Sequence, residues 1–312
     1  LNYISANEVD GSSGQITYTQ WLNDDGRIEA DLTVIKMDSD KFMVVTSDVA
    51  HRHTETWMKR HIGDDQNVIV TDVTSSYGQL NIQGPRSRDL LQSICSVDLS
   101  NESFPFRAMR EIDIGLGRVL CVRITYAGEL GYELYIPSEQ ALHVYDRIVD
   151  AGKNFGLRHA GLKALASLRL EKGYRDYGHD IDNMDDPYST GLGFAVRTNK
   201  LGDFIGKQAC LVRKANRNYE QRLVNIFLRD PEPILQHQEI VLRDGKPVGY
   251  VRAGSYGHTL GGSVGLAMVD GDPVNAAYLS NGQWTVKIAE RIYPAEVSLK
   301  PFYDPDMVRI RA

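Results

Sequence analysis

Two runs of alternating apolar and polar residues flank a short turn near the start of the chain. Residues 14–20 alternate in this way, and residues 28–34 place an apolar side chain at every even position. Residues 23–26, with the sequence NDDG, have the composition of a tight reversal. Because successive side chains of a strand point to opposite faces, this pattern predicts an antiparallel hairpin with one buried face.

The chain of 312 residues is long enough for several cores, and the pattern predicts three units. Residues 1–66 add a strand at 41–46 and a helix at 51–61, which makes an antiparallel α+β unit. Residues 201–312 turn to short strands separated by Gly, Pro and Asp-Gly, as in a β-barrel or jelly roll. The middle unit, residues 67–200, is also α+β, with strands predicted at 68–73, 77–82, 110–115, 118–126 and 133–136 and helices at 86–94, 138–151 (capped by Ser138) and 163–171.

Composition excludes several classes of protein. Charged residues make up 24% of the chain, the formal net charge is −6 and no basic stripe is present, so no nucleic-acid partner is expected. No run approaches the roughly 18 apolar residues of a membrane span. Cys95, Cys121 and Cys210 form no CxxC pair, which argues against a disulfide framework or a zinc site and favours a reducing compartment. The sequence contains no dinucleotide, P-loop, nucleophile-elbow or zinc-protease motif, and no repeat of fixed period is visible.

Asp31 is the first candidate for chemistry. Spacing alone puts it on the polar face of the second strand, where a carboxylate is most often simply solvated. The functional interpretation is a carboxylate that points into a site and stabilises positive charge developing on an amine. The strand pattern leaves both interpretations open.

The second candidate is the sequence TYAGELGYE at residues 125–133. Its two glycines let the backbone turn sharply after a strand, and the plain interpretation is a corner with two solvated carboxylates. As a ligand site, a carboxylate of this stretch, Glu129 or Glu133, would accept two adjacent N–H donors of a pterin or guanine edge. The flanking Tyr126 and Tyr132 would stack on an aromatic ring.

A third stretch, GYRDYGHDID at residues 173–182, follows a predicted helix. The plain interpretation is a polar, aromatic loop. His179 lies between acidic residues, but no second histidine stands at ligand spacing. No metal site is therefore predicted.

Taken in order, these motifs resemble the aminomethyltransferase, or glycine-cleavage T-protein, superfamily over essentially the whole chain. The resemblance implies a three-domain ring with tetrahydrofolate in its central opening. Two folate-binding α+β units would be followed by a C-terminal barrel, and the first unit would be truncated at its N-terminus. The matching stretches are 22–32, 83–87, 126–133, 167–173, 248–251 and 299–302.

Finer features resemble the C-terminal folate region of sarcosine and dimethylglycine dehydrogenase-type flavoenzymes. They lie at residues 98–106, 171–180 and 302–305. In that branch an N-terminal FAD domain oxidises an N-methyl amine, and the folate region captures the one-carbon unit as 5,10-methylenetetrahydrofolate. The resemblance thus implies a flavin domain as partner, in the same polypeptide or complex. This chain would lack that domain and the first part of the folate region.

Functional residues carry over from the family by position. The functional Asp of the family matches Asp31, and its pterin-binding Glu matches Glu133. Tyr126, Tyr132 and Tyr177 are candidates for lining the folate pocket. The resemblance also implies a location in the bacterial cytoplasm or the mitochondrial matrix, and because Leu1 is not Met we expect a missing N-terminal segment.

Two alternatives stay open. One is a stand-alone aminomethyltransferase that takes its substrate from a lipoyl carrier protein. Leu165 argues against it, because glycine-cleavage T-proteins have an Arg at this position and the dehydrogenase branch is apolar there. The other is a non-catalytic homologue similar to the pyruvate dehydrogenase phosphatase regulatory subunit, and the presence of both Asp31 and Glu133 argues against it.

Overall fold

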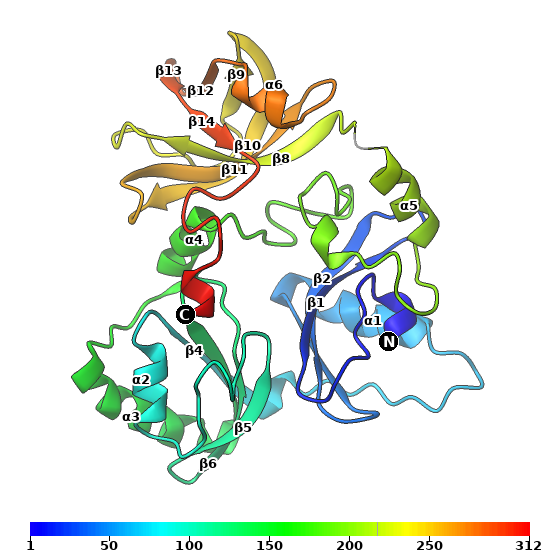
Figure 1. Ribbon diagram of the computed structural model, residues 1–312, viewed down its shortest axis with the longest axis vertical. Coiled ribbons are helices and arrows are strands. Elements are labelled where there is room, and N and C mark those ends of the chain that lie inside the picture. Colours follow the sequence, from blue (N-terminus) through cyan, green and yellow to red (C-terminus); the bar gives the residue numbers. More distant parts are fainter. Residues whose placement is uncertain (217) are drawn as a thin grey trace.

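Three lobes surround a central region in the computed structural model, which describes residues 1–216 and 218–312 (Figure 1). The sheets of all three lobes are antiparallel. The first lobe contains β1 (Ile16–Leu22), β2 (Ile28–Lys36), β3 (Phe42–Thr46) and α1 (His51–Arg60). The second contains β4 (Tyr77–Gln83), α2 (Ser87–Gln92), β5 (Met109–Ile114), β6 (Gly117–Val122), β7 (Gly131–Pro137), α3 (Ala141–Gly152) and α4 (Leu162–Glu171).

The third lobe is a curled sheet of seven strands, paired in the order β13-β12-β9-β10-β11-β8-β14. Leu279 of the short helix α6 packs into its core with Val224 and Trp284. The α+β class and the C-terminal barrel predicted from the sequence are therefore confirmed. The elements of this lobe are β8 (Gln221–Leu228), β9 (Ile240–Arg243), β10 (Lys246–Gly257), β11 (Gly262–Asp270), α6 (Ala276–Ser280), β12 (Trp284–Ile288), β13 (Arg291–Pro294) and β14 (Glu296–Ser298).

The first two sheets repeat one topology that no sequence period reveals. Strands β1, β2 and β3 pair as consecutive neighbours and α1 follows, while β5, β6 and β7 pair in the same order and α3 follows. The second sheet has one strand more, because β4 pairs with the outer edge of β7 and leads into α2. The equivalent edge of β3 has no strand partner in the described part of the chain.

A helix covers one face of each sheet. Trp57 of α1 packs with Ala30 and Leu32 of β2. In the second lobe, Val144 and Ile148 of α3 join the core beneath β5, β6 and β7. The uncovered faces of the two sheets are therefore free to meet each other.

Backbone and side-chain contacts join these two uncovered faces. Ile16 N donates to the carbonyl oxygen of Arg107 at 3.0 Å, so the start of β1 continues the pairing of the second sheet. Ile16 and Ile35 of the first sheet then pack with Tyr135 and Val122 of the second. The two sheets thus form one interface.

The segment between α4 and the barrel returns to the first lobe. Ile28 N donates to the carbonyl oxygen of Asp185 at 2.9 Å. The buried ammonium of Lys200 donates to three backbone oxygen atoms within residues 2–7. The helix α5 (Lys207–Ala215) ends this segment. The domain boundary at residue 200 stays a prediction, but this packing places the preceding loop with the first lobe.

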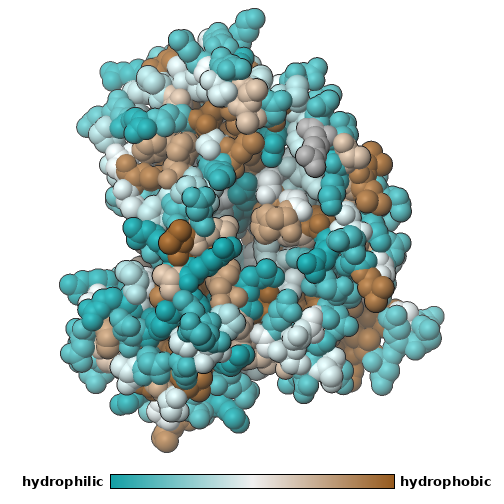
Figure 2. Space-filling view, in the orientation of Figure 1, coloured by the Kyte–Doolittle hydropathy of each residue, from teal (hydrophilic) through white to brown (hydrophobic). Residues whose placement is uncertain are grey.

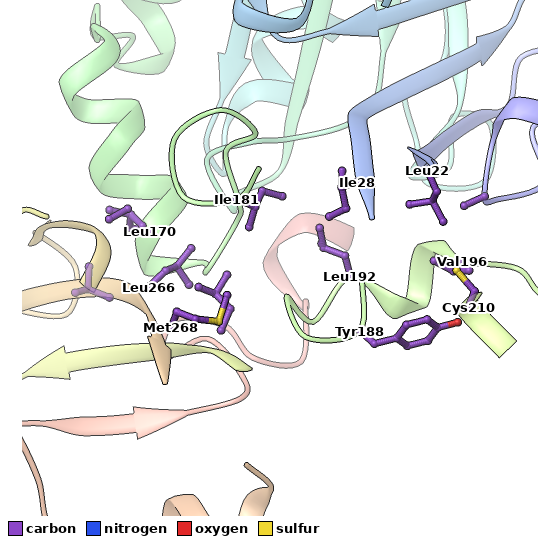
Figure 3. Packing of buried hydrophobic residues seen from close by; sticks show 14 of the residues in the cluster. Leu22, Ile28, Leu170, Ile181, Tyr188, Leu192, Val196, Cys210, Leu266 and Met268 are labelled. Carbon is purple, nitrogen blue, oxygen red and sulfur yellow. The ribbon is translucent and has the colours of Figure 1, made fainter. Parts of the chain in front are cut away.

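One apolar cluster connects all three parts at the centre (Figure 3). It brings together buried side chains from the first sheet, from α4, from the returning segment and from the barrel. They include Leu22, Ile28, Leu170, Ile181, Leu192, Val196, Leu266 and Met268. Because each lobe contributes to this cluster, separating any one lobe would expose apolar surface of the others.

Several sequence predictions are wrong in detail. Residues 68–73 form no strand: they pair with none of the described strands, and Ile69 is 87% exposed there. Ser138 does not cap α3: its hydroxyl donates to the carbonyl oxygen of Ser75, and the helix begins three residues later. Helices α5 and α6 were not predicted, since both are short and depend on tertiary packing. Within the described residues no helix has the length and apolar character to cross a membrane.

The free edge of β3 generates a prediction. A chain with a strand-forming segment added upstream of Leu1 is expected to pair that segment with β3, because the topological repeat has a strand at the equivalent edge of the second sheet. That pairing would raise the melting temperature by at least about 2 °C and reduce association of exposed strand edges. Thermal melting and light scattering at equal concentration measure both effects. Equal melting temperatures and a monomeric state for both chains would contradict the prediction.

Candidate functional site

Asp31 lies near the middle of β2, on the face opposite α1. Ala30 and Leu32 on either side of it are buried in the core under α1, whereas Asp31 is half-buried on the other face. The strand register places Asp31 opposite Gln20 of β1, whose Nε2 donates to Asp31 Oδ1 at 2.8 Å. The hydroxyl of Tyr18, on the same face of β1, also hydrogen-bonds the carboxylate.

The surroundings of Asp31 change its acidity. Burial raises the pKa of Asp31 to about 6, and the hydrogen bonds from Tyr18 and Gln20 and the charge of Arg175 offset only part of that rise. A carboxyl group that titrates this close to neutrality is well placed to accept a proton from an amine. The plain interpretation of a solvated strand carboxylate therefore does not describe Asp31.

Glu133 lies on β7 and is also half-buried. Tyr135 donates its hydroxyl to Glu133 Oε2 at 2.9 Å, and Gln79 of β4 donates its Nε2 to the same oxygen at 3.2 Å. Burial raises the pKa of Glu133, while these two hydrogen bonds lower it. Both hydrogen bonds go to Oε2, so Oε1 takes part in neither of them.

The two carboxylates lie on the faces that join the first and second sheets. Tyr135, two residues after Glu133 and hence on the same face of β7, packs with Ile16 and Ile35. Ile35 in turn shares its face of β2 with Asp31. The space-filling view shows a hollow where the lobes meet (Figure 2). Two open depressions elsewhere on the surface contain neither carboxylate.

Tyr132 does not reach this region, which corrects the prediction that it lines the pocket. Its side chain is 0% exposed and lies in the core of the second lobe, with its ring centroid 5.8 Å from that of Phe104. Its hydroxyl accepts a hydrogen bond from Arg88 Nε at 3.3 Å. Because Tyr132 and Glu133 are neighbours on one strand, they must point to opposite faces.

Tyr177 contacts β2, the strand that carries Asp31, and Tyr126 contacts the backbone of Arg175. The hydroxyl of Tyr126 donates to the carbonyl oxygen of Arg175 at 2.7 Å, and its ring stacks on Tyr174 with centroids 5.9 Å apart. Tyr177 donates its hydroxyl to a backbone oxygen of β2 at 3.0 Å. Burial, together with smaller effects of nearby acids that include Asp31, raises the pKa of Tyr177 to about 12.

Sequence reasoning missed four residues of this region. Gln20, Tyr18 and Arg175 surround the Asp31 carboxylate. Phe194, whose ring is 75% exposed, stacks with Tyr18 at a centroid distance of 6.0 Å. The strand alternation of β1 could have placed Gln20 and Tyr18 on one face. Nothing in the sequence brings residues 175 and 194 next to β1.

Two family models match the chain. The GCVT N-terminal domain matches residues 1–200, and the glycine cleavage T-protein C-terminal barrel domain matches residues 221–304. The chain belongs to the glycine cleavage T-protein family. Asp31 and Glu133 both lie within the N-terminal match.

The curated relatives differ in length. 4-Methylaminobutanoate oxidase (formaldehyde-forming) of Paenarthrobacter nicotinovorans is 41% identical over 97% of this chain, which covers 36% of that protein. Mitochondrial sarcosine dehydrogenase of Mus musculus is 30% identical over 99% of the chain, which covers 35% of it. The aminomethyltransferase of Oceanobacillus iheyensis is shorter: the chain covers 81% of it, at 31% identity over 97% of the chain. The chain therefore spans about a third of the length of the first two relatives.

A solved structure supports the fold. The glycine cleavage system aminomethyltransferase T from Bartonella henselae matches with a TM-score of 0.82 at 22% identity, over 98% of this chain and 81% of that one. At this identity the match bears on the T-protein fold and not on the substrate.

The raised pKa of Asp31 predicts a pH-dependent effect on stability. A folded pKa near 6, above the ordinary value of 3.8, means that the folded state holds a proton that the unfolded state releases. Stability contributed by this group is therefore lost as the pH rises from about 4 to about 6. Asp31→Asn should remove that loss. Relative to the wild type, its free energy of unfolding should be higher at pH 7.5 than at pH 4.5 by on the order of 1 kcal/mol. Partial solvent contact of Asp31 keeps this difference below the full value of the pKa shift.

Urea unfolding of both chains at the two pH values measures this difference. Asp113→Asn serves as the control, because Asp113 lies exposed on β5. A pH-independent difference between Asp31→Asn and the wild type would show that Asp31 has an ordinary acidity.

Proposed function

We propose that this chain binds tetrahydrofolate between its first two sheets and catalyses transfer of a one-carbon unit to it, with 5,10-methylenetetrahydrofolate as product. The carbon would come from oxidative demethylation of an N-methyl amine such as sarcosine or dimethylglycine. The observation that carries the proposal is the pair of half-buried carboxylates, Asp31 and Glu133, on the joined faces of two sheets. Membership of the glycine cleavage T-protein family supports tetrahydrofolate as the ligand.

Glu133 is the proposed anchor for the pterin. A carboxylate accepts hydrogen bonds from two adjacent N–H groups, which is the pattern that a pterin edge offers. Its hydrogen bonds from Tyr135 and Gln79 both reach Oε2 and fix the side chain, while Oε1 faces neither donor. Tyr126, Tyr177 and the exposed ring of Phe194 are the aromatic groups we propose for stacking on the ligand.

A second polar atom also fits a ligand. Gln20 is 0% exposed, and its Oε1 has no hydrogen-bond partner among the described residues. A buried acceptor without a partner destabilises a protein, so a ligand N–H at this point would satisfy it. Because Gln20 also donates to Asp31, this N–H would lie beside the carboxylate.

Asp31 is the proposed proton acceptor. Bound folate supplies the amine nitrogens that take up the one-carbon unit. Asp31 lies where positive charge would develop on such an amine, and with a pKa near 6 it is mostly ionised at neutral pH. Hydrogen bonds from Gln20 and Tyr18 hold the carboxylate in place.

The source of the carbon is inferred from the relatives. The names of two of them describe an oxidase that forms formaldehyde and a dehydrogenase of sarcosine. We propose that an amine-oxidising unit with FAD, in the same polypeptide or in a complex, produces the iminium or formaldehyde that reaches Asp31. The length of both relatives beyond the matched region leaves room for such a unit.

A stand-alone aminomethyltransferase is the second candidate. The relative from Oceanobacillus iheyensis favours it, because this chain covers most of that protein. Leu165, half-buried in α4, argues for the amine-oxidising branch. Supplying an aminomethyl-lipoyl carrier protein separates the two, since only the stand-alone enzyme would consume it.

Glu133→Gln should weaken binding of tetrahydrofolate. The change replaces one oxygen acceptor with an NH2 donor, so one charge-assisted hydrogen bond is lost at a cost of about 1.5–3 kcal/mol. Calorimetric titration would then show an increase in Kd of roughly 10- to 100-fold. Glu111→Gln, on an exposed position of β5, is the matched control and should leave Kd unchanged. An unchanged Kd for Glu133→Gln would contradict the proposal that Glu133 binds the pterin.

Asp31→Asn should spare folate binding and reduce transfer. Asn keeps the shape and accepts one hydrogen bond, but it neither carries charge nor takes up a proton, so the loss falls on the chemical step. In protein that also carries the amine-oxidising unit, amine oxidation should continue while formaldehyde escapes into solution. Separate assays of amine consumption, free formaldehyde and methylenetetrahydrofolate follow these quantities. A full methylenetetrahydrofolate yield would mean that Asp31 has no part in transfer.

A further inference from the structure

The C-terminal residues leave the barrel and cross to the second lobe. Residues 301–312, here called the strap, run from β14 past α4 toward β4 (Figure 1). The far end is held firmly: Ile310 is buried, and the carbonyl oxygen of Ala312 accepts hydrogen bonds from Arg88 at 2.7 Å and from Arg123 at 3.0 Å. The strap therefore packs as an ordered part of the fold.

Lys172 connects the strap to the interior. It directly follows α4, its side chain is 0% exposed, and its Nζ lies 2.8 Å from Asp304 Oδ2. Its methylene groups lie against Gly128, since a Cβ added there would stand 3.0 Å from Lys172 Cβ and Cγ. Gly128 has a φ of +77°, which favours glycine. A single buried cation is thus in contact with both the strap and the turn at residues 125–131.

The strap backbone adopts this shape at a cost. Asp304 and Met307 have φ angles of 42° and 59°, in the left-handed region that non-glycine residues rarely adopt. Besides Lys172, the Asp304 carboxylate accepts hydrogen bonds from Val308 N at 2.9 Å and Arg309 N at 3.2 Å. Such strain persists only where surrounding contacts hold it, and Asp304 is the centre of those contacts.

A second set of contacts joins the strap to the same turn. The hydroxyl of Tyr303 donates to Glu129, and Arg309 Nη1 lies 3.7 Å from the same carboxylate. The turn carries Tyr126, whose ring stacks on Tyr174. Both anchor points of the strap, Asp304 and Tyr303, therefore act on the segment that places Tyr126.

We propose that the strap is a positioning element for the folate site. Through Lys172–Asp304 and Tyr303–Glu129 it holds residues 125–131 so that Tyr126 keeps its stacking on Tyr174 and its hydrogen bond to the Arg175 backbone. Asp304 itself touches no ligand and acts through Lys172 and the turn. The role in ligand binding rests on the proposed folate function, whereas the ordering of the turn does not.

Asp304→Asn tests the proposal, because Asn preserves the shape and removes the charge that Lys172 needs. Amide hydrogen exchange of residues 126–130, followed by mass spectrometry, should become about fivefold faster or more. The Kd for 5-formyltetrahydrofolate, used as a stable probe, should rise about fivefold. Tyr303→Phe removes the second anchor with a smaller change and should produce the same two effects, so the test survives if Asp304→Asn folds poorly.

Asp185→Asn is the control for a purely structural effect. Asp185 is 5% exposed and pairs with Arg252 Nη1 at 2.9 Å, on the side of the barrel that contacts the first lobe. This variant should melt at a lower temperature, like Asp304→Asn, but leave exchange at residues 126–130 and Kd unchanged. If Asp185→Asn and Asp304→Asn changed exchange and Kd equally, the strap would contribute only to general stability, and the proposal would be overturned.

The two readouts also separate this proposal from the folate function. Unchanged exchange at residues 126–130 in both strap variants overturns the positioning role. Faster exchange with an unchanged Kd overturns the link to ligand binding. A wild-type chain that does not bind the probe contradicts the folate function, and with it the link, while the exchange result still decides whether the strap orders the turn.

Discussion

The first two β-sheets meet through Ile16, Ile35 and Tyr135, and this contact decides which side chains can meet at the candidate site. Along each strand, successive side chains alternate between the two faces, which determines the face of each carboxylate. This alternation puts Asp31 on the face of Ile35 and Glu133 on the face of Tyr135. A slip of one residue in either strand would send its carboxylate into a hydrophobic core. The register is protected because the same slip would expose the apolar residues now buried under α1 and α3.

The candidate site holds two carboxylates in surroundings where burial disfavours their charged form. Asp31 and Glu133 both lose water on folding, and burial raises the pKa of each. Hydrogen bonds from neighbouring strands compensate part of the lost hydration: Gln20 donates to Asp31, and Gln79 donates to Glu133. Burial of apolar side chains elsewhere, as in the central cluster, offsets the remaining free-energy cost of burying these carboxylates. A ligand with N–H donors would reduce the cost further.

The sequence predicts the strands that carry both carboxylates, because alternation is a local property that survives in the folded chain. The same alternation should have excluded Tyr132 from the site, since neighbours on a strand cannot share a face. Phe194 and Arg175 could not be found in this way, because only the tertiary fold brings them to β1. The segment at residues 68–73 shows the converse: it has the composition of a strand, yet a strand also needs a partner. The topological repeat of the first two lobes is invisible in sequence because packing conserves faces rather than residues.

A short stretch at the end of α4 shows how the three lobes become one unit. Arg169, Glu171 and Lys172 are all buried, and each pairs with a different part of the chain. Arg169 binds Asp180 in the loop beside the site at 2.9 Å, and Glu171 Oε1 accepts from two backbone N–H groups of the barrel turn after β10. Lys172 binds the strap.

Each of these charges is tolerable only with its own partner, because a buried ion that loses its partner typically destabilises a protein by about 3–5 kcal/mol. The loop, the barrel and the strap must therefore all be in place before the end of α4 can be buried. Assembly of the folate site is in this way coupled to the docking of the barrel, although the barrel contributes neither Asp31 nor Glu133. This coupling gives a physical reason for a C-terminal lobe in a chain whose candidate chemistry lies entirely in the first two.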